Sequence, residues 1–93
     1  MDEAAYLRLK YLYDMILGHH TALTLHWHRE PAEVLERELL GFLNELDKMT
    51  EQYSELRHLS YEIDSVRNSD FDRSDFDDLL REVRQLLGEY DEY

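Results

Sequence analysis

The sequence contains no cysteine, one proline and only three glycines in 93 residues. The missing cysteine excludes disulfide bonds, thiolate metal sites, iron–sulfur clusters and cysteine nucleophiles. The glycines lie too far apart to form a phosphate-binding loop, and no Gly-x-Ser-x-Gly or Walker sequence is present. We therefore predict a protein that is not an enzyme and that binds no cofactor.

Long apolar runs are also missing from the sequence. No run approaches the ~20 residues that a helix needs to cross a bilayer. The first residues, Met1, Asp2 and Glu3, are acidic, whereas a signal or transit peptide begins with basic residues. We expect a soluble, cytoplasmic protein with no membrane partner.

Basic residues are few, because 10 lysines and arginines stand against 22 aspartates and glutamates. The formal net charge is therefore -12 at pH 7. A charge of this sign and size disfavours direct binding to nucleic acid or to an anionic membrane. It favours a partner protein with a basic surface, toward which the negative field would steer association.

Apolar residues recur every three or four positions in three segments, and this periodicity predicts helices. The predicted helices cover about residues 3–28, 31–67 and 75–87. Short connections between helices favour neighbours that run in opposite directions. The sequence therefore predicts one all-α domain over residues 1–93, an antiparallel three-helix bundle with a long central helix and a short acidic third helix.

Two parts of this helix prediction are less sharply defined. The first helix could break near residues 18–21, and residues 19–29 could be extended instead, because leucines and histidines alternate there. At the other end Gly88 suits a helix stop, so the tail 88–93 is expected to fray.

The central helix, about residues 32–67, carries the clearest pattern in the chain. Its apolar positions alternate steps of four and three, as in a coiled coil: Leu35, Leu39, Phe42, Leu46, Met49, Tyr53, Leu56, Ser60 and Ile63. One short helix on each side would leave part of this stripe uncovered. The residues then available for self-association would be Leu46, Met49, Tyr53, Leu56 and Ile63, which makes a homodimer an alternative.

A five-residue unit is nearly repeated at 69–73 and 74–78. One interpretation is structural: Ser74 and the aspartates cap a helix, and the phenylalanines anchor a loop. The other is that phenylalanines ringed by carboxylates form a docking element for a basic partner. On that second interpretation the candidate partner-binding residues are Asp70, Phe71, Asp72, Asp75, Asp77, Asp78, Glu82 and Tyr90.

Four of the five histidines fall within residues 19–28. If this segment were extended, His26 and His28 would share a face and could bind a metal together with Glu30. On a helix, residues two apart point in different directions. We therefore predict no metal site, with His26 and His28 as weak candidates only.

Three function classes remain. The first is a non-catalytic acidic protein-binding module or inhibitor that occupies a basic, for example nucleic-acid-binding, surface of a partner. DNA mimics, phage-encoded anti-defence and anti-CRISPR proteins, antitoxins and nuclease-immunity proteins act in this way. The alternatives are a self-associating helical module, structural or adaptor in role, and a metal-binding helical protein that uses the histidine cluster.

Overall fold

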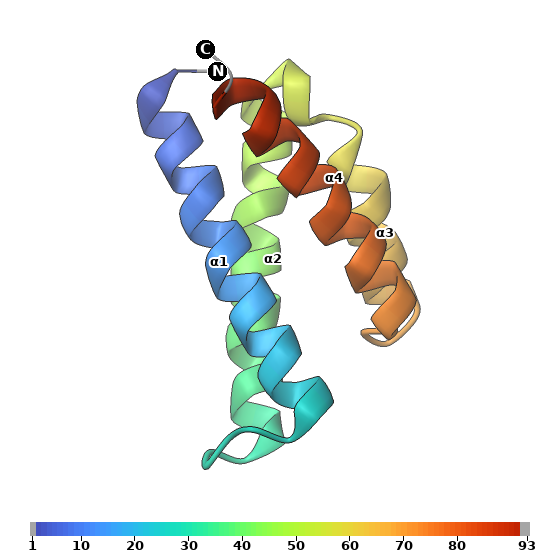
Figure 1. Cartoon of the computed structure of the whole chain (residues 1–93). Coiled ribbons are helices and arrows are strands. Elements are labelled where there is room, and N and C mark those ends of the chain that lie inside the picture. Colours follow the sequence, from blue (N-terminus) through green and yellow to red (C-terminus); the bar gives the residue numbers. More distant parts are fainter. Residues whose placement is uncertain (1, 92–93) are drawn as a thin grey trace.

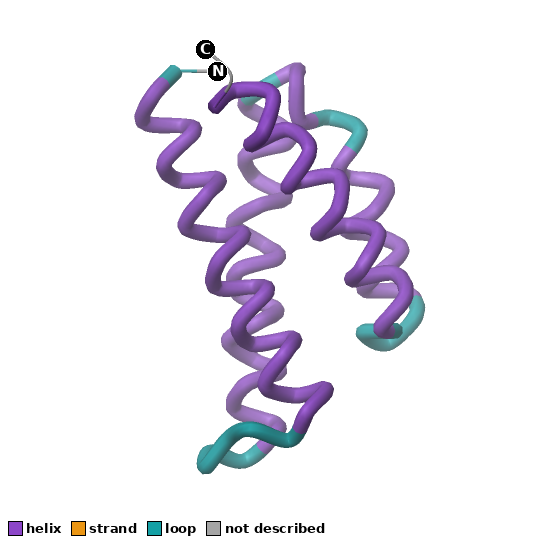
Figure 2. Tube along the Cα trace, in the orientation of Figure 1, coloured by secondary structure: helices purple, strands orange, loops and turns teal. Residues whose placement is uncertain are grey.

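The computed structural model describes residues 2–91, with side chains through residue 89. Its helices are α1 (Glu3–Leu25), α2 (Ala32–Gln52), α3 (Leu59–Asn68) and α4 (Arg73–Asp91), with a 3-10 turn, η1 (Ser54–Leu56), between α2 and α3. Figures 1 and 2 show these helices joined by short loops. No residue from 2 to 91 lies in a strand. The all-α prediction is confirmed, but the bundle contains four helices and not three.

The four helices form an elongated bundle that measures 39 × 23 × 19 Å. Helix α1 contacts both α2 and α4, while α3 contacts α4 and α2. The loop between α1 and α2 lies at one end of the molecule, and η1 lies toward the other (Figure 1). None of the helices over residues 2–91 combines the length and the apolar character that a membrane span requires.

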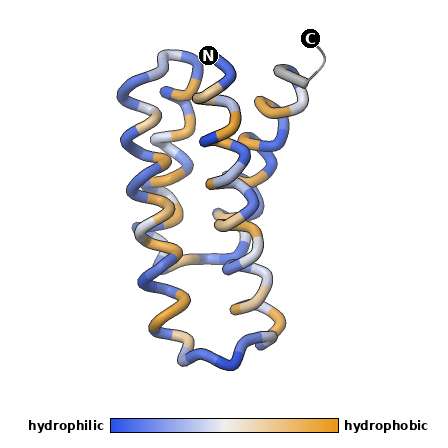
Figure 3. Tube along the Cα trace, turned by 90° about the vertical axis from the view of Figure 1, so that its left-hand side faces the viewer, coloured by the Kyte–Doolittle hydropathy of each residue, from blue (hydrophilic) through white to orange (hydrophobic). Residues whose placement is uncertain are grey.

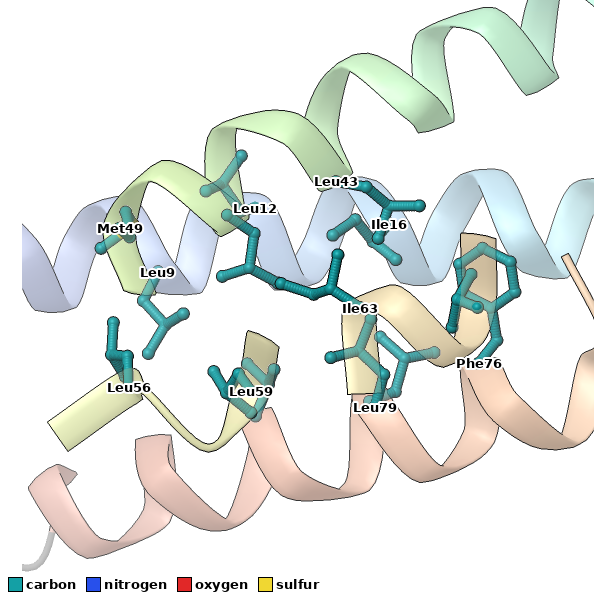
Figure 4. Packing of buried hydrophobic residues seen from close by; sticks show 14 of the residues in the cluster. Leu9, Leu12, Ile16, Leu43, Met49, Leu56, Leu59, Ile63, Phe76 and Leu79 are labelled. Carbon is teal, nitrogen blue, oxygen red and sulfur yellow. The ribbon is translucent and has the colours of Figure 1, made fainter. Parts of the chain in front are cut away.

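A single apolar core lies between the helices. Figure 4 shows side chains from α1, α2, η1, α3 and α4 pointing toward one another. The largest fully buried side chains are Phe76, Leu9, Leu12, Ile16, Leu39, Leu43, Leu46, Leu56, Leu59, Ile63, Leu79 and Val66. Every element supplies at least one of them, so the burial of apolar surface that drives folding joins the whole described chain.

The predicted continuous helix over 31–67 is wrong, because the chain breaks at Tyr53. This residue has an extended backbone, with φ -123° and ψ 118°, and it ends α2. An unbroken helix of that length would measure roughly 54 Å at 1.5 Å per residue, which is longer than the molecule. After the break the chain turns its apolar residues back into the core, so that Leu59 is buried and Ser60 is not.

Helix α1 is continuous through Gly18, so the break that could occur near 18–21 does not occur. The helix ends at Leu25, earlier than the predicted residue 28. His26 then adopts a left-handed conformation with φ 57°, and its N–H bonds to the Ala22 carbonyl. This is a common way for a helix to end. Trp27 therefore lies in the loop and does not continue the apolar stripe of the helix.

Helix α4 is longer at both ends than the predicted 75–87. It begins at Arg73 and passes Gly88 without a break to reach Asp91. No glycine of the described chain has a positive φ, so Gly88 does not form the left-handed cap that would end the helix. The tail is thus helical at least to Asp91, and the remainder of the predicted frayed segment lies outside the described residues.

Candidate functional site

The two phenylalanines of the repeated unit are parts of the core. Phe76 is fully buried, and its ring stacks on that of His20 with centroids 4.5 Å apart. Phe71 is half-buried and packs on Phe76 with centroids 5.8 Å apart. The structural interpretation of the repeat accounts for Phe76, because a stacked and fully buried ring is not free to enter a partner. Phe71 packs against it and keeps part of its surface exposed.

The loop before α4 has a left-handed backbone at two consecutive residues. Asp70 has φ 56° and Phe71 has φ 64°. Aspartate tolerates this region better than most residues, whereas a bulky aromatic residue rarely adopts it. Phe71 is held there by its contact with Phe76 and by a 3.0 Å hydrogen bond from its N–H to the Val66 carbonyl. This turn carries the chain from α3 into α4 and leaves Asp70 exposed.

Asp72, and not Ser74, caps the start of α4. One carboxylate oxygen of Asp72 accepts hydrogen bonds from the Ser74 N–H at 2.9 Å and from the Ser74 hydroxyl at 2.6 Å. Because these bonds favour the charged form, they hold the pKa of the Asp72 carboxyl below its usual value. The cap lies two residues earlier than the sequence predicts. The Asp72 carboxylate is therefore used to stabilise the start of α4.

Four acidic residues of α4 recur at spacings of three, four and seven, which places them on one face of the helix. We call this face the acidic ridge: Asp75, Asp78, Glu82 and Glu89. No ridge side chain is fully buried. The Glu82 carboxylate lies 3.9 Å from Nε2 of His58, at the start of α3, so the ridge borders α3.

The arginines of α4 are mostly placed away from this ridge. Only Arg81 lies three or four residues from a ridge residue, and it pairs with Asp78. Arg73 and Arg84 are eleven residues apart and so share another part of the helix surface. Four carboxylates of α4 thus lie on the face beside α3, whereas Asp77, four residues from both Arg73 and Arg81, lies on the side of the arginines.

The structure brings together only some of the predicted partner-binding residues. Asp75, Asp78 and Glu82 share the ridge, whereas Asp77 lies on another face, 3.9 Å from His20 on α1. The side chain of Tyr90 lies outside the described residues. The prediction did not include Glu89, although its seven-residue spacing from Glu82 is a signal that was present in the sequence.

His20 lines a hollow of about 260 Å³ between α1, α2 and the start of α4. The hollow is also lined by Asp70, Phe71 and Arg73. Burial lowers the pKa of His20 below its ordinary value of 6.5; Asp77 acts in the opposite direction, and Arg73 adds to the lowering. The neutral imidazole is therefore the form that the fold favours.

This lowered pKa predicts a pH dependence of stability. The unfolded chain binds a proton at His20 more readily than the folded chain, so the free energy of unfolding falls as the pH drops below 6.5. We compare urea unfolding at about pH 7.5 and about pH 5.5. Between these two pH values the free energy of unfolding should fall more for the wild type than for His20→Gln, whose side chain does not titrate. Equal losses would show that His20 is not the group responsible.

The histidines of the cluster make separate contacts. His26 caps α1, and Nδ1 of His28 lies 2.7 Å from the Glu30 carbonyl. His19 bridges two helices, with Nδ1 2.9 Å from the Met15 carbonyl and Nε2 2.7 Å from the Glu38 carboxylate. Over residues 2–91 no three histidine or acidic side chains lie close enough to hold an ion. The extended segment on which His26 and His28 would share a face is not formed over residues 19–25, which lie in α1.

The residues predicted for self-association through the heptad stripe are not on the surface. Leu46, Met49, Leu56 and Ile63 are all buried in the core of the same chain, and Tyr53 is half-buried. The additional helix boundary at Tyr53 lets α3 and α4 cover them. Self-association through the four buried residues would require the bundle to open.

No family model matches the chain, and neither a curated protein nor a solved structure matches it.

Proposed function

We propose that the protein is a non-catalytic protein-binding module whose acidic ridge occupies a basic surface of a partner protein. The observation that carries this proposal is the row of four carboxylates on one face of α4, formed by Asp75, Asp78, Glu82 and Glu89. A charged helix that serves only for solubility has no need to gather four carboxylates on one face. The net charge of -12 adds a long-range field of the same sign.

The ridge resembles a row of phosphates in its physical effect. Side chains three and four residues apart on a helix are about 5–6 Å apart at Cβ. At 1.5 Å per residue the four ridge carboxylates give one charge per roughly 7 Å of helix axis, about half the density of a DNA strand, which carries one charge per ~3.4 Å. Arginines and lysines that bind phosphates can pair with carboxylates as well. The function class is that of an inhibitor that occupies a nucleic-acid-binding surface, and a cytoplasmic location stays a prediction.

A large aromatic side chain is exposed on α3, the helix that the ridge borders. Tyr61 on α3 is 74% exposed, although tyrosine offers a large apolar ring. Aromatic residues of this kind are enriched among those that dominate binding energy at interfaces. Because α3 and α4 pack together, a partner seated on the ridge could also reach the α3 surface.

The test is a capture experiment with two charge-matched variants. The ridge variant carries Asp78→Lys, Glu82→Lys and Glu89→Lys. The control variant carries Glu30→Lys, Glu36→Lys and Glu51→Lys, which changes the net charge by the same amount at exposed positions outside α4. Asp75 is left unchanged because it lies in the first turn of α4, where a carboxylate stabilises the helix.

We expect the ridge variant to bind the captured partner at least about tenfold more weakly than the control variant, because like charges then face each other across the interface. Thermal unfolding of each variant checks that it remains folded. Equal weakening in both variants would show that net charge alone is responsible and that the ridge has no special role.

A further inference from the structure

Trp27 exposes 74% of its surface, although it is the largest apolar side chain of the protein. It follows His26, which ends α1, and so lies in the loop that joins α1 to α2 at one end of the bundle (Figure 1). Within residues 2–91 its ring stacks on no other ring. Tryptophan is enriched among the residues that dominate binding energy at interfaces. Packing within the chain does not account for this indole, so we examined its surroundings for a binding site.

The indole lines a groove of about 490 Å³ between α1, this loop and α2. Gly18 and Ala22 of α1 contribute small residues to the lining, and Met15 and Leu35 contribute apolar ones. In Figure 3 the half of α1 that leads into the loop is mostly pale or orange. A Cβ atom added to Gly18 would meet no atom within 4 Å, so the space above it is open. The groove therefore has room and apolar surface for an aliphatic chain.

The charges of the groove favour a cation. Asp14, Glu30 and Glu38 line it, whereas Arg29 is the only lysine or arginine in the lining. The Glu38 carboxylate is occupied by His19, whose Nε2 lies 2.7 Å away. Within the described residues the carboxylates of Asp14 and Glu30 form no hydrogen bond or ion pair, and Arg29 pairs with neither. Two carboxylates are thus left beside the exposed indole for a charged group from outside the chain.

The guanidinium group of an arginine side chain fits this combination of groups. It is planar and weakly hydrated, so it stacks on an indole face, and its N–H groups pair with carboxylates. The aliphatic stem of arginine covers apolar surface while the charged end stays near water. A metal ion fits less well, because over residues 2–91 no three acidic or histidine side chains lie close enough to hold one.

We propose that this groove binds an arginine side chain of a partner protein, with the guanidinium on Trp27 beside the carboxylates of Asp14 and Glu30. The stem of the arginine and an apolar neighbour in the partner then lie over Gly18 and Ala22.

This site is separate from the acidic ridge. Helix α1 contacts α2 and α4, and α3 contacts α4 and α2, so the α1–α2 pair and the α3–α4 pair form opposite sides of the bundle. The groove lies on the first side, and the ridge borders α3 on the second. The arginine site therefore does not rest on the ridge proposal, and Glu30 can be changed without altering the ridge.

Trp27 is the only tryptophan of the chain, so its fluorescence reports on this groove alone. The probe is the blocked peptide acetyl-Leu-Arg-Leu-amide, titrated into the protein. We expect a saturable change in the tryptophan emission. The same peptide with citrulline, which keeps the shape of arginine but lacks its charge, should bind at least about tenfold more weakly. The lysine peptide should also bind more weakly than the arginine peptide, because an ammonium group is not planar and is strongly hydrated.

Two charge-matched variants test the carboxylates. The groove variant carries Asp14→Asn and Glu30→Gln, and its control carries Glu36→Gln and Glu51→Gln, which are exposed positions outside the groove. Both variants lose two negative charges. The groove variant should bind the arginine peptide at least about tenfold more weakly than its control.

Two glycines in similar settings test the open space. Gly18 and Gly41 are both exposed within helices, and an added Cβ at either would meet nothing. Both Gly18→Gln and Gly41→Gln should keep or raise the melting temperature, because glutamine is the better helix former. Gly18→Gln places a side chain in the groove and should abolish the saturable fluorescence change, whereas Gly41→Gln should bind like the wild type.

The proposal is overturned if the arginine peptide gives no saturable change in the wild type, or if the citrulline or lysine peptide binds as tightly as the arginine peptide. It is also overturned if the groove variant binds like its control, or if Gly18→Gln binds like Gly41→Gln. None of these results bears on the ridge proposal, because partner capture is a separate readout that depends on α4.

Discussion

Replacement of Phe76 by alanine is expected to lower the free energy of unfolding by about 3–5 kcal/mol. The ring is fully buried and contacts both His20 and Phe71, so its removal leaves a cavity where α1 and α4 meet. Domains of this kind have a total stability of about 5–15 kcal/mol. The variant should therefore show a much lower midpoint in urea unfolding.

Phe71→Ala is the matched control for this experiment. Phe71 belongs to the same repeated unit but is only half-buried. Its replacement should therefore lower the free energy of unfolding clearly less than the replacement of Phe76 does. If neither replacement lowers the free energy of unfolding by much, the repeat is not structural. A docking role for its rings would then have to be considered again. A large loss at Phe76 alone agrees with its place in the core.

The second large effect concerns the break between α2 and α3. Leu59→Ala is expected to lower the free energy of unfolding by about 2–5 kcal/mol, because Leu59 is fully buried in the core. Ser60→Ala should change it by no more than about 0.5 kcal/mol, since the Ser60 side chain is partly exposed and bonds only to the nearby Arg57 carbonyl.

These two neighbours distinguish the broken helix from a continuous one. A helix that continued the stripe of four and three through Tyr53 would point residue 60 inward and place residue 59 at the edge of the stripe, about 100° around the helix. The order of the two losses would then be reversed. Urea unfolding of both variants and of the wild type measures the two changes in the free energy of unfolding.

The sequence predicted the helical class well because its apolar periodicity is strong in every segment. The core residues of α1, such as Leu9, Leu12 and Ile16, follow from that periodicity, and they are buried as expected. The break at Tyr53 was not predicted, since neither glycine nor proline marks it and the stripe continues across it. The available signal was that Leu59 and Val66 are apolar positions that a continuous stripe leaves outside.

The candidate site was predicted less well than the fold. The composition of the segment after residue 70 shows an excess of carboxylates, but composition does not say which of them have structural partners. Asp72 is used as a cap and Asp77 lies beside His20, whereas Asp78 and Glu82 stay on the ridge. Only the packing of α4 against α1 and α3 separates these roles.

The central claim is that the acidic ridge binds a basic partner, and a titration at two salt concentrations tests it most directly. The partner captured by the wild type is purified and titrated into the wild type, the ridge variant and the control variant. At low salt we predict tight binding for the wild type and the control variant and weak binding for the ridge variant. At about 0.5 M salt, where screening is strong, all three should bind weakly. A complex that withstands salt, or a ridge variant that binds as tightly as the control, would contradict the claim.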